Sequence, residues 1–145
     1  KNENSIDLLL SLNGLPVATV EIKNQFTGQD TTHAKRQYIE DRDPAELLFS
    51  FKKRALVHFV VDADEVYFTT LLNRGKTRFF PFNKGFEQGA GNPLNKHGHK
   101  TAYLWEEIWQ RDSWLDIVGR FIHLQIETNT EGGKKKKEEV ANEKL

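Results

Sequence analysis

The sequence predicts an α/β fold with a mixed central sheet flanked by helices. Residues 7–12 and 17–23 alternate apolar and polar side chains with the period of two that is typical of strands. Residues 31–54 have helix-like spacing, and two further runs rich in β-branched and aromatic residues follow at 56–61 and 66–72. A chain of 145 residues with 37% hydrophobic residues can bury one core, so we expect a single folded domain.

The first two predicted strands are joined by Asn13-Gly14, a dipeptide typical of tight hairpins. A plain two-residue loop would pair Leu8 with Thr19, which places apolar side chains opposite polar ones. A loop with an odd number of residues, or a bulge after the turn, instead puts Leu8 on the same face as Val20. That second register gathers three charged residues on the opposite face of the hairpin: Asp7, Glu21 and Lys23.

The helical region begins at a threonine that can act as a cap, Thr31 or Thr32. Asp43-Pro44 is expected to interrupt the helix, because the residue before a proline avoids helical geometry. A second helical stretch is expected after the proline, with Leu47, Leu48 and Phe51 on its apolar side.

The remaining elements follow from composition and spacing. The strands at 56–61 and 66–72 flank a polar segment and predict a second hairpin, and residues 78–82 predict a short further strand. Residues 83–100 are dense in Gly, Asn, Lys and His and predict a long irregular loop. Residues 101–124 have helical spacing with a break near residues 111–113.

The charges are balanced, with 21 basic and 21 acidic residues, and residues 1–133 alone carry 16 basic and 18 acidic residues. Phosphate neutralisation by Lys and Arg supplies most non-specific DNA affinity, so a DNA-binding role would need other parts to deliver the DNA. The chain has no cysteine, which excludes disulfides and thiolate metal sites and is compatible with a cytoplasmic location, which we expect. No apolar run approaches the roughly 20 residues of a membrane span.

The two ends of the sequence suggest that it belongs to a longer protein. Residues 131–145 contain Gly132-Gly133, four consecutive lysines and a mixed polar run, a composition typical of a linker. We therefore expect a folded domain over residues 1–130. The chain has no methionine, even at position 1, so we also expect that the domain lacks an upstream part.

An acidic residue on one strand followed by Glu-x-Lys on the next is the pattern of the PD-(D/E)xK nucleases. Asp7, Glu21 and Lys23 fit this pattern. The pattern by itself is weak, because alternating charges on an exposed strand are common and are then simply solvated.

The wider sequence resembles the restriction (R) subunit of type I restriction-modification enzymes over residues 5–125. The resemblance is carried by blocks that occur in order along the chain: Asp7-Leu-Leu-Leu, Asn13-Gly-Leu-Pro, Val20-Glu-Ile-Lys-Asn, Arg36-Gln-Tyr, Asp41-Arg-Asp, Phe80-Pro-Phe-Asn-Lys-Gly and Lys100-Thr-Ala-Tyr-Leu-Trp-Glu-Glu. Several blocks in one order are far more specific than three charges.

The resemblance implies a PD-(D/E)xK restriction-endonuclease-like core, the endonuclease domain of a type I site-specific deoxyribonuclease. It implies Mg²⁺ held by the side chains of Asp7 and Glu21 and by the backbone carbonyl of Ile22, with Lys23 acting on the attacking water. Gln37 fits the first position of the Gln-x-x-x-Tyr motif of the family. The fourth residue after it is Asp41 and not tyrosine, so the role of the tyrosine stays open.

The resemblance also implies partners. These are DNA, the methyltransferase and specificity subunits, and an ATP-dependent translocase that follows in the same subunit and uses the ATP. Residues 131–145 would be the linker toward that translocase. The alternative is a non-catalytic docking module that keeps the nuclease-like fold.

Overall fold

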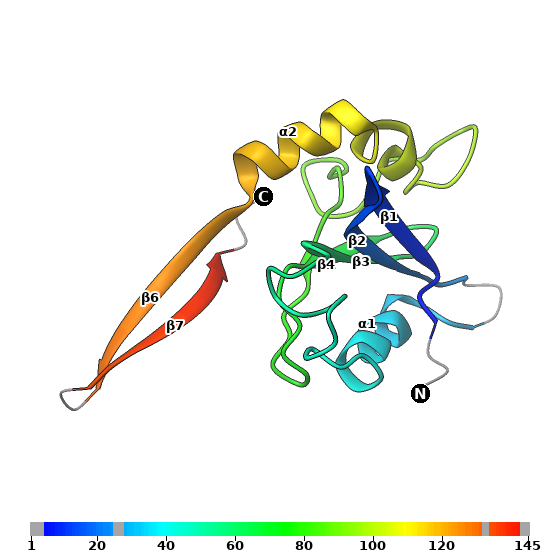
Figure 1. The fold of residues 1–145 in the computed structure, drawn as a ribbon. Coiled ribbons are helices and arrows are strands. Elements are labelled where there is room, and N and C mark those ends of the chain that lie inside the picture. Colours follow the sequence, from blue (N-terminus) through cyan, green and yellow to red (C-terminus); the bar gives the residue numbers. More distant parts are fainter. Residues whose placement is uncertain (1–4, 25–27, 132–133, 143–145) are drawn as a thin grey trace. The chain divides into compact units, whose positions relative to one another are not determined.

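The computed structural model describes residues 5–24, 28–131 and 134–142 and divides into two compact units (Figure 1). The first unit extends to Tyr103 and contains a five-stranded sheet in the order β1-β2-β3-β4-β5. Strands β2 and β3 are parallel and the other neighbours are antiparallel, so the predicted mixed sheet is confirmed. The elements of this unit are β1 (Leu8–Leu12), β2 (Leu15–Ile22), α1 (Thr31–Glu40), β3 (Val57–Val61), β4 (Val66–Thr69) and β5 (Phe80–Pro81).

The hairpin of β1 and β2 has a two-residue turn followed by a bulge. Asn13 and Gly14 both have positive φ, 50° and 81°, as the tight turns of hairpins require. Ser11 lies opposite Pro16 but Leu10 lies opposite Ala18, so the register shifts by one residue after the turn. Of the two registers that the sequence left open, the structure has the one with the bulge.

Helix α1 begins one residue earlier than the threonines suggested. The carboxylate of Asp30 accepts hydrogen bonds from the amides of Thr32 (2.9 Å) and His33 (3.3 Å), which makes Asp30 the N-cap. The prediction that Thr31 or Thr32 caps the helix is therefore wrong. Thr31 is instead buried as the first helical residue.

The helix ends at Glu40, and Asp43-Pro44 interrupts the helical region as predicted. The second helix expected around Leu47, Leu48 and Phe51 is wrong, because residues 44–54 form a series of turns. The apolar spacing there reflects local turns that bury Phe49, which is 5% exposed.

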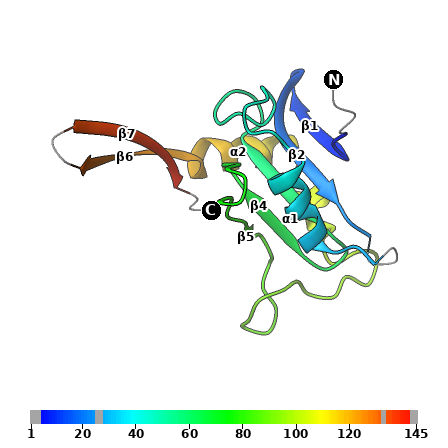
Figure 2. The same cartoon turned by 90° about the horizontal axis from the view of Figure 1, so that it is seen from below.

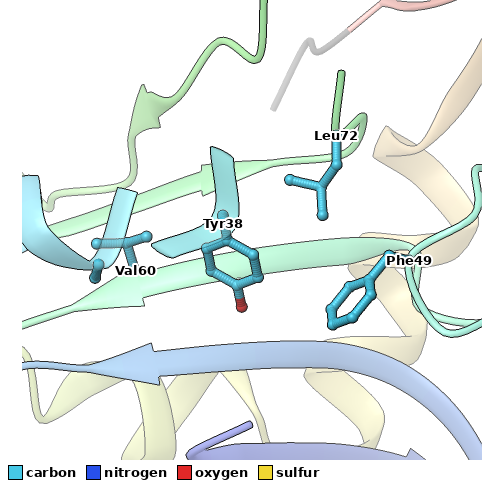
Figure 3. Packing of buried hydrophobic residues seen from close by; sticks show 5 residues of the cluster. Tyr38, Phe49, Val60 and Leu72 are labelled. Carbon is cyan, nitrogen blue, oxygen red and sulfur yellow. The ribbon is translucent and has the colours of Figure 1, made fainter. Parts of the chain in front are cut away.

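One face of the sheet is covered by α1, which lies along it (Figure 2). The core on this face brings together residues from α1, the following turns, β3 and the segment after β4 (Figure 3). Its buried members are Ala34, Tyr38, Phe49, Val60 and Leu72. Burial of such apolar surface stabilises the fold by roughly 25 cal/mol per Å².

The other face carries Ala18 and Val20, both fully buried, together with aromatic side chains. Phe68 packs its ring against those of Phe80 and Phe82 at centroid distances of 6.1 and 5.7 Å. In the bulged register the same alternation that places Leu8 beside Val20 also predicts Leu10, Leu12 and Ile22 in a core on this face. That is wrong for two of them, since Leu8 is 37% and Ile22 49% exposed: β1 lies at the edge of the sheet and Ile22 ends β2.

The second predicted hairpin is confirmed by β3 and β4, which pair antiparallel, and the short third strand by β5. Residues 83–100 form no helix or named strand, as predicted for an irregular loop. Asn92 fixes this loop in place, because its side chain donates to the carbonyl of Asp64 (2.9 Å) and accepts from the amide of Lys84 (2.8 Å). Lys100 adds an ion pair with Asp64 at 2.7 Å.

The second unit, from Leu104 onward, contains a π-helical turn η2 (Leu104–Ile108) and helix α2 (Arg111–Phe121). A broken helix is therefore confirmed, but the break lies at residues 109–110, and residues 111–113, where it was predicted, form the first turn of α2. Strands β6 (His123–Glu131) and β7 (Lys134–Asn142) then form an antiparallel pair. Part of the expected linker, residues 132–133 and 143–145, lies outside the described residues. The role of residues 131–145 as a linker stays a prediction, as does a domain boundary near residue 130. In the described part of the chain no helix is long and apolar enough to cross a membrane.

A buried polar network lies between α1 and the sheet. The Thr19 hydroxyl is hydrogen-bonded to the Tyr38 hydroxyl (2.8 Å) and to His58 Nδ1 (2.7 Å), so it joins β2, α1 and β3. All three side chains are almost completely buried. Loss of solvent lowers the pKa of His58 from 6.5 to about 3, so the ring is neutral at neutral pH.

We predict that the His58 ring stays neutral in the folded chain down to about pH 4, because its protonation would place a charge in this core. The pKa of His58 is lower in the folded chain than in the unfolded chain. The contribution of His58 to the stability of the fold is therefore fully present above pH 6.5 and is lost as the pH falls toward 3. Within that window each pH unit lowers the unfolding free energy by about 1.4 kcal/mol. NMR of the imidazole nitrogens tests this, with the urea-unfolded chain as control. Protonation of folded His58 near pH 6.5 would contradict it.

Candidate active site

The three charged residues of the predicted site come from the β1-β2 hairpin. Asp7 directly precedes β1, Glu21 lies within β2 and Lys23 directly follows β2. Leu8 lies opposite Val20, so Asp7 reaches the end of β2, where its Oδ2 accepts a hydrogen bond from the amide of Ile22 at 2.8 Å. The predicted proximity of Asp7 and Glu21 therefore follows from the bulged register.

Lys23 is held in line with β2 by its backbone. Its amide donates to the carbonyl of Val61 at 2.8 Å, which continues the pairing of β2 with β3 beyond the end of the strand. Alternation along an extended chain then places Lys23 on the same side as Glu21. The residue is half-buried, and its Nζ forms no ion pair with any described residue. The amine is thus not committed to a structural salt bridge in the described part of the chain.

Glu21 is fully buried. The guanidinium of Arg42 donates to its Oε1 through Nε (3.1 Å) and through Nη2. Arg42 is itself only 3% exposed. An interpretation of the charges as a solvated surface strand is therefore wrong for Glu21, because α1 and the segment after it cover this face of the sheet.

The carboxylate of Glu21 is not fully satisfied. Its Oε2 is buried and has no hydrogen-bond partner among the described residues. Burial raises the pKa of Glu21 to about 7, the Arg42 guanidinium opposes this rise, and the nearby carboxylate of Asp7 adds to it. A buried oxygen without a partner is unfavourable, so this position is suited to a cation.

The donor set at this position suits a hard cation. Two carboxylates, Asp7 and Glu21, lie next to each other, and the described residues contain no group of three or more acidic, His or Cys side chains that could hold a metal. Mg²⁺ is usually bound through one or two carboxylates and keeps several waters, so two carboxylates are enough. The orphaned Oε2 of Glu21 fits a Mg²⁺ ligand.

Other predicted site residues are placed less centrally. Gln37 lies on α1, and its backbone carbonyl accepts from the amide of Asp41 at 3.0 Å to close the helix. No hydrogen bond joins the Gln37 side chain to Asp7, Glu21 or Lys23 among the described residues. The side chain of Ile22 is 49% exposed at the end of β2, and its carbonyl as a ligand stays a prediction.

Tyr38 directly follows Gln37 and could be considered for the role of the tyrosine in the Gln-x-x-x-Tyr motif. Tyr38 is fully buried, and its hydroxyl contacts Thr19. It therefore serves the core beneath Glu21 and is not free to reach a substrate. Asp41, at the fourth position after Gln37, forms the C-cap of α1 and is exposed.

Arg42 is the site residue that the sequence did not reveal. It was present in the Asp41-Arg42-Asp43 block, but nothing local marks it as a partner of a residue 21 positions earlier. A signal did exist: Arg42 follows Tyr38 by four residues, so a continued helical path would place both on the face toward the sheet.

Together, the mixed α/β fold and the two adjacent carboxylates with a lysine beside them define a protein with a candidate cation site at the end of a β-hairpin. The family model described as type I restriction enzyme R protein N terminus matches residues 1–77. This match covers more than half of the chain and all of the site, and the chain belongs to this family. The comparisons with curated proteins and with solved structures gave no match.

We predict that Arg42→Ala lowers the unfolding free energy by about 3–5 kcal/mol, because the buried Glu21 carboxyl loses its hydrogen-bonded cation and must then stay charged without a partner or take up a proton. Arg74→Ala is the matched control. Arg74 pairs with Asp43 at 3.2 Å, but both side chains are about half exposed or more, so its loss should change stability by less than about 1 kcal/mol. Urea unfolding measures both variants. An equal, small effect of the two substitutions would contradict the buried pairing.

Proposed function

We propose that this chain is a Mg²⁺-dependent endonuclease domain with a PD-(D/E)xK core. The observation that carries the proposal is the buried Oε2 of Glu21, which has no partner, beside the carboxylate of Asp7. Lys23 follows on the same side of the extended chain. Surface charge patterns do not require a buried carboxylate, whereas metal sites do use them.

Each residue has a distinct role in this proposal. Asp7 and Glu21 would hold the ion, together with the backbone carbonyl of Ile22. Mg²⁺ held by these residues would supply Lewis-acid polarisation of a phosphate oxygen and would make water a better nucleophile. Lys23 would orient the attacking water and offset the negative charge that grows on the phosphoryl oxygens. Gln37 would help to position the DNA or the water from α1.

The family assignment supports a place for this domain in a type I restriction complex. We propose that DNA reaches the site through an ATP-dependent translocase in the same subunit and that methyltransferase and specificity subunits select the target. The balanced charge of the chain, 21 basic and 21 acidic residues, agrees with delivery of DNA by other parts. In this account the chain itself does not hydrolyse ATP.

The rival function is a non-catalytic docking module with the same fold. Two observations favour it: Arg42 pairs with Glu21 without any metal, and Asp41 stands where the family motif has tyrosine. The rival makes no use of the buried Oε2 of Glu21, which has no hydrogen-bond partner among the described residues, or of the adjacent Asp7. We therefore favour the nuclease.

We predict that Asp7→Ala and Lys23→Ala each reduce Mg²⁺-dependent DNA cleavage by the complete enzyme by about 10²-fold or more, a typical loss for a group that stabilises the transition state. ATP hydrolysis should be unchanged. Asp112→Ala and Lys76→Ala are matched controls, since both residues are exposed and far along the chain from the site. Cleavage that survives in Asp7→Ala would favour the docking module.

We also predict that Lys23→Arg loses most of the cleavage activity although it keeps the positive charge. The guanidinium is planar, is always protonated and cannot take the compact position of an amine beside a water. Single-turnover cleavage at saturating Mg²⁺ measures the effect. Wild-type cleavage rates in this variant would refute the proposed role of Lys23.

A further inference from the structure

We propose that Arg42 is the positioning residue of the metal site: its guanidinium fixes the Glu21 carboxylate and the segment carrying Asp7 so that both present oxygen atoms to one cation. This inference rests on the proposed function and extends it to a residue outside the Asp7, Glu21 and Lys23 set.

The first support is how Arg42 contacts Glu21. Its Nε and Nη2 both donate to Oε1, and neither donates to Oε2. A bidentate arginine commonly satisfies both oxygens of a carboxylate, one with each nitrogen. Here the second oxygen is left available, while the two bonds to the first fix the plane of the carboxylate.

The second support is a contact on the other side of the guanidinium. Nη2 of Arg42 also donates to the backbone carbonyl of Ser5 at 2.5 Å. Ser5 lies two residues before Asp7, and the Asp7 carboxylate is held in turn by the amide of Ile22. One buried arginine therefore fixes the backbone that carries Asp7 as well as the side chain of Glu21.

The third support is burial. Arg42 is 3% exposed and Glu21 is fully buried, so solvent does not screen the pair and side-chain alternatives are few. Groups that orient metal ligands from behind typically affect metal affinity by about 10- to 100-fold. The geometry matches such a role, because Arg42 contacts the ligand through Oε1 and leaves Oε2 for the ion.

Lysine can test geometry separately from charge. Arg42→Lys keeps one positive charge but replaces the planar guanidinium by a flexible ammonium, whose single nitrogen cannot reproduce the two hydrogen bonds to Oε1 from separate nitrogens together with the bond to Ser5. Arg42→Gln is a second variant that can donate one neutral hydrogen bond. The matched control is Arg74→Lys, which alters an exposed arginine paired with Asp43.

The first measurement is the binding of Mn²⁺ to the complete R subunit without ATP, monitored through the electron paramagnetic resonance signal of free Mn²⁺. The second is the dependence of DNA cleavage on the metal concentration. Asp7→Ala identifies the ion that belongs to this site. We expect Arg42→Lys and Arg42→Gln to bind that ion about 10- to 100-fold more weakly than wild type. Saturating metal should restore most of the cleavage rate of Arg42→Lys, and Arg74→Lys should behave as wild type.

Two results would overturn the inference. Unchanged Mn²⁺ affinity in folded Arg42→Lys and Arg42→Gln would mean that Arg42 only neutralises a buried charge. Tighter binding in either variant would mean that the arginine competes with the ion. A different result addresses the proposed function: if Asp7→Ala binds as many Mn²⁺ ions as wild type, no metal site exists at this position and both proposals fail.

Discussion

The buried pair of Glu21 and Arg42 is the interaction on which the candidate site depends. A lone carboxylate in the interior is strongly unfavourable, and an arginine that donates two hydrogen bonds to it makes its burial tolerable. The pair joins the centre of the sheet to the segment after α1, so the helix, β2 and the chain before β1 are fixed around one charge. The pair leaves Oε2 of Glu21 without a hydrogen-bond partner among the described residues, which is why we propose this oxygen as a cation ligand.

Helix α1 supplies Tyr38, and the segment just after it supplies the charge of Arg42. Tyr38 and Arg42 are four residues apart and meet Thr19 and Glu21, which are two residues apart on one face of β2. The Thr19, Tyr38 and His58 network therefore lies next to the site and ties it to the core. The bulge that buries Ala18 and Val20 on the other face also brings Asp7 to Glu21. The bulged register of β1 and β2 therefore determines both the packing of this hairpin against the core and the position of Asp7 in the site.

The sequence was sufficient for features set by local pattern. Asn13-Gly14 indicated the hairpin, and alternation gathered Asp7, Glu21 and Lys23, but pattern alone left the register open between a plain turn and a bulge. Tertiary packing determined the rest. Leu47, Leu48 and Phe51 have helical spacing but lie in a series of turns. These turns bury Phe49, which the helical spacing did not single out. The spacing of four residues from Tyr38 hinted at the side toward which Arg42 points, but no local pattern identified its partner, which lies 21 residues earlier.

We propose that Asp7 and Oε2 of Glu21 form one cation site, with Arg42 on the far side of the Glu21 carboxylate. The most direct measurement is a crystal structure of the protein from crystals grown with Mn²⁺, in which the anomalous scattering of Mn²⁺ locates the ion. We expect one anomalous-scattering peak within bonding distance of an Asp7 oxygen and of Glu21 Oε2, with Arg42 still hydrogen-bonded to Oε1. Saturating Mn²⁺ with no peak between these two carboxylates, or with Arg42 displaced from Glu21 by the ion, would contradict the account.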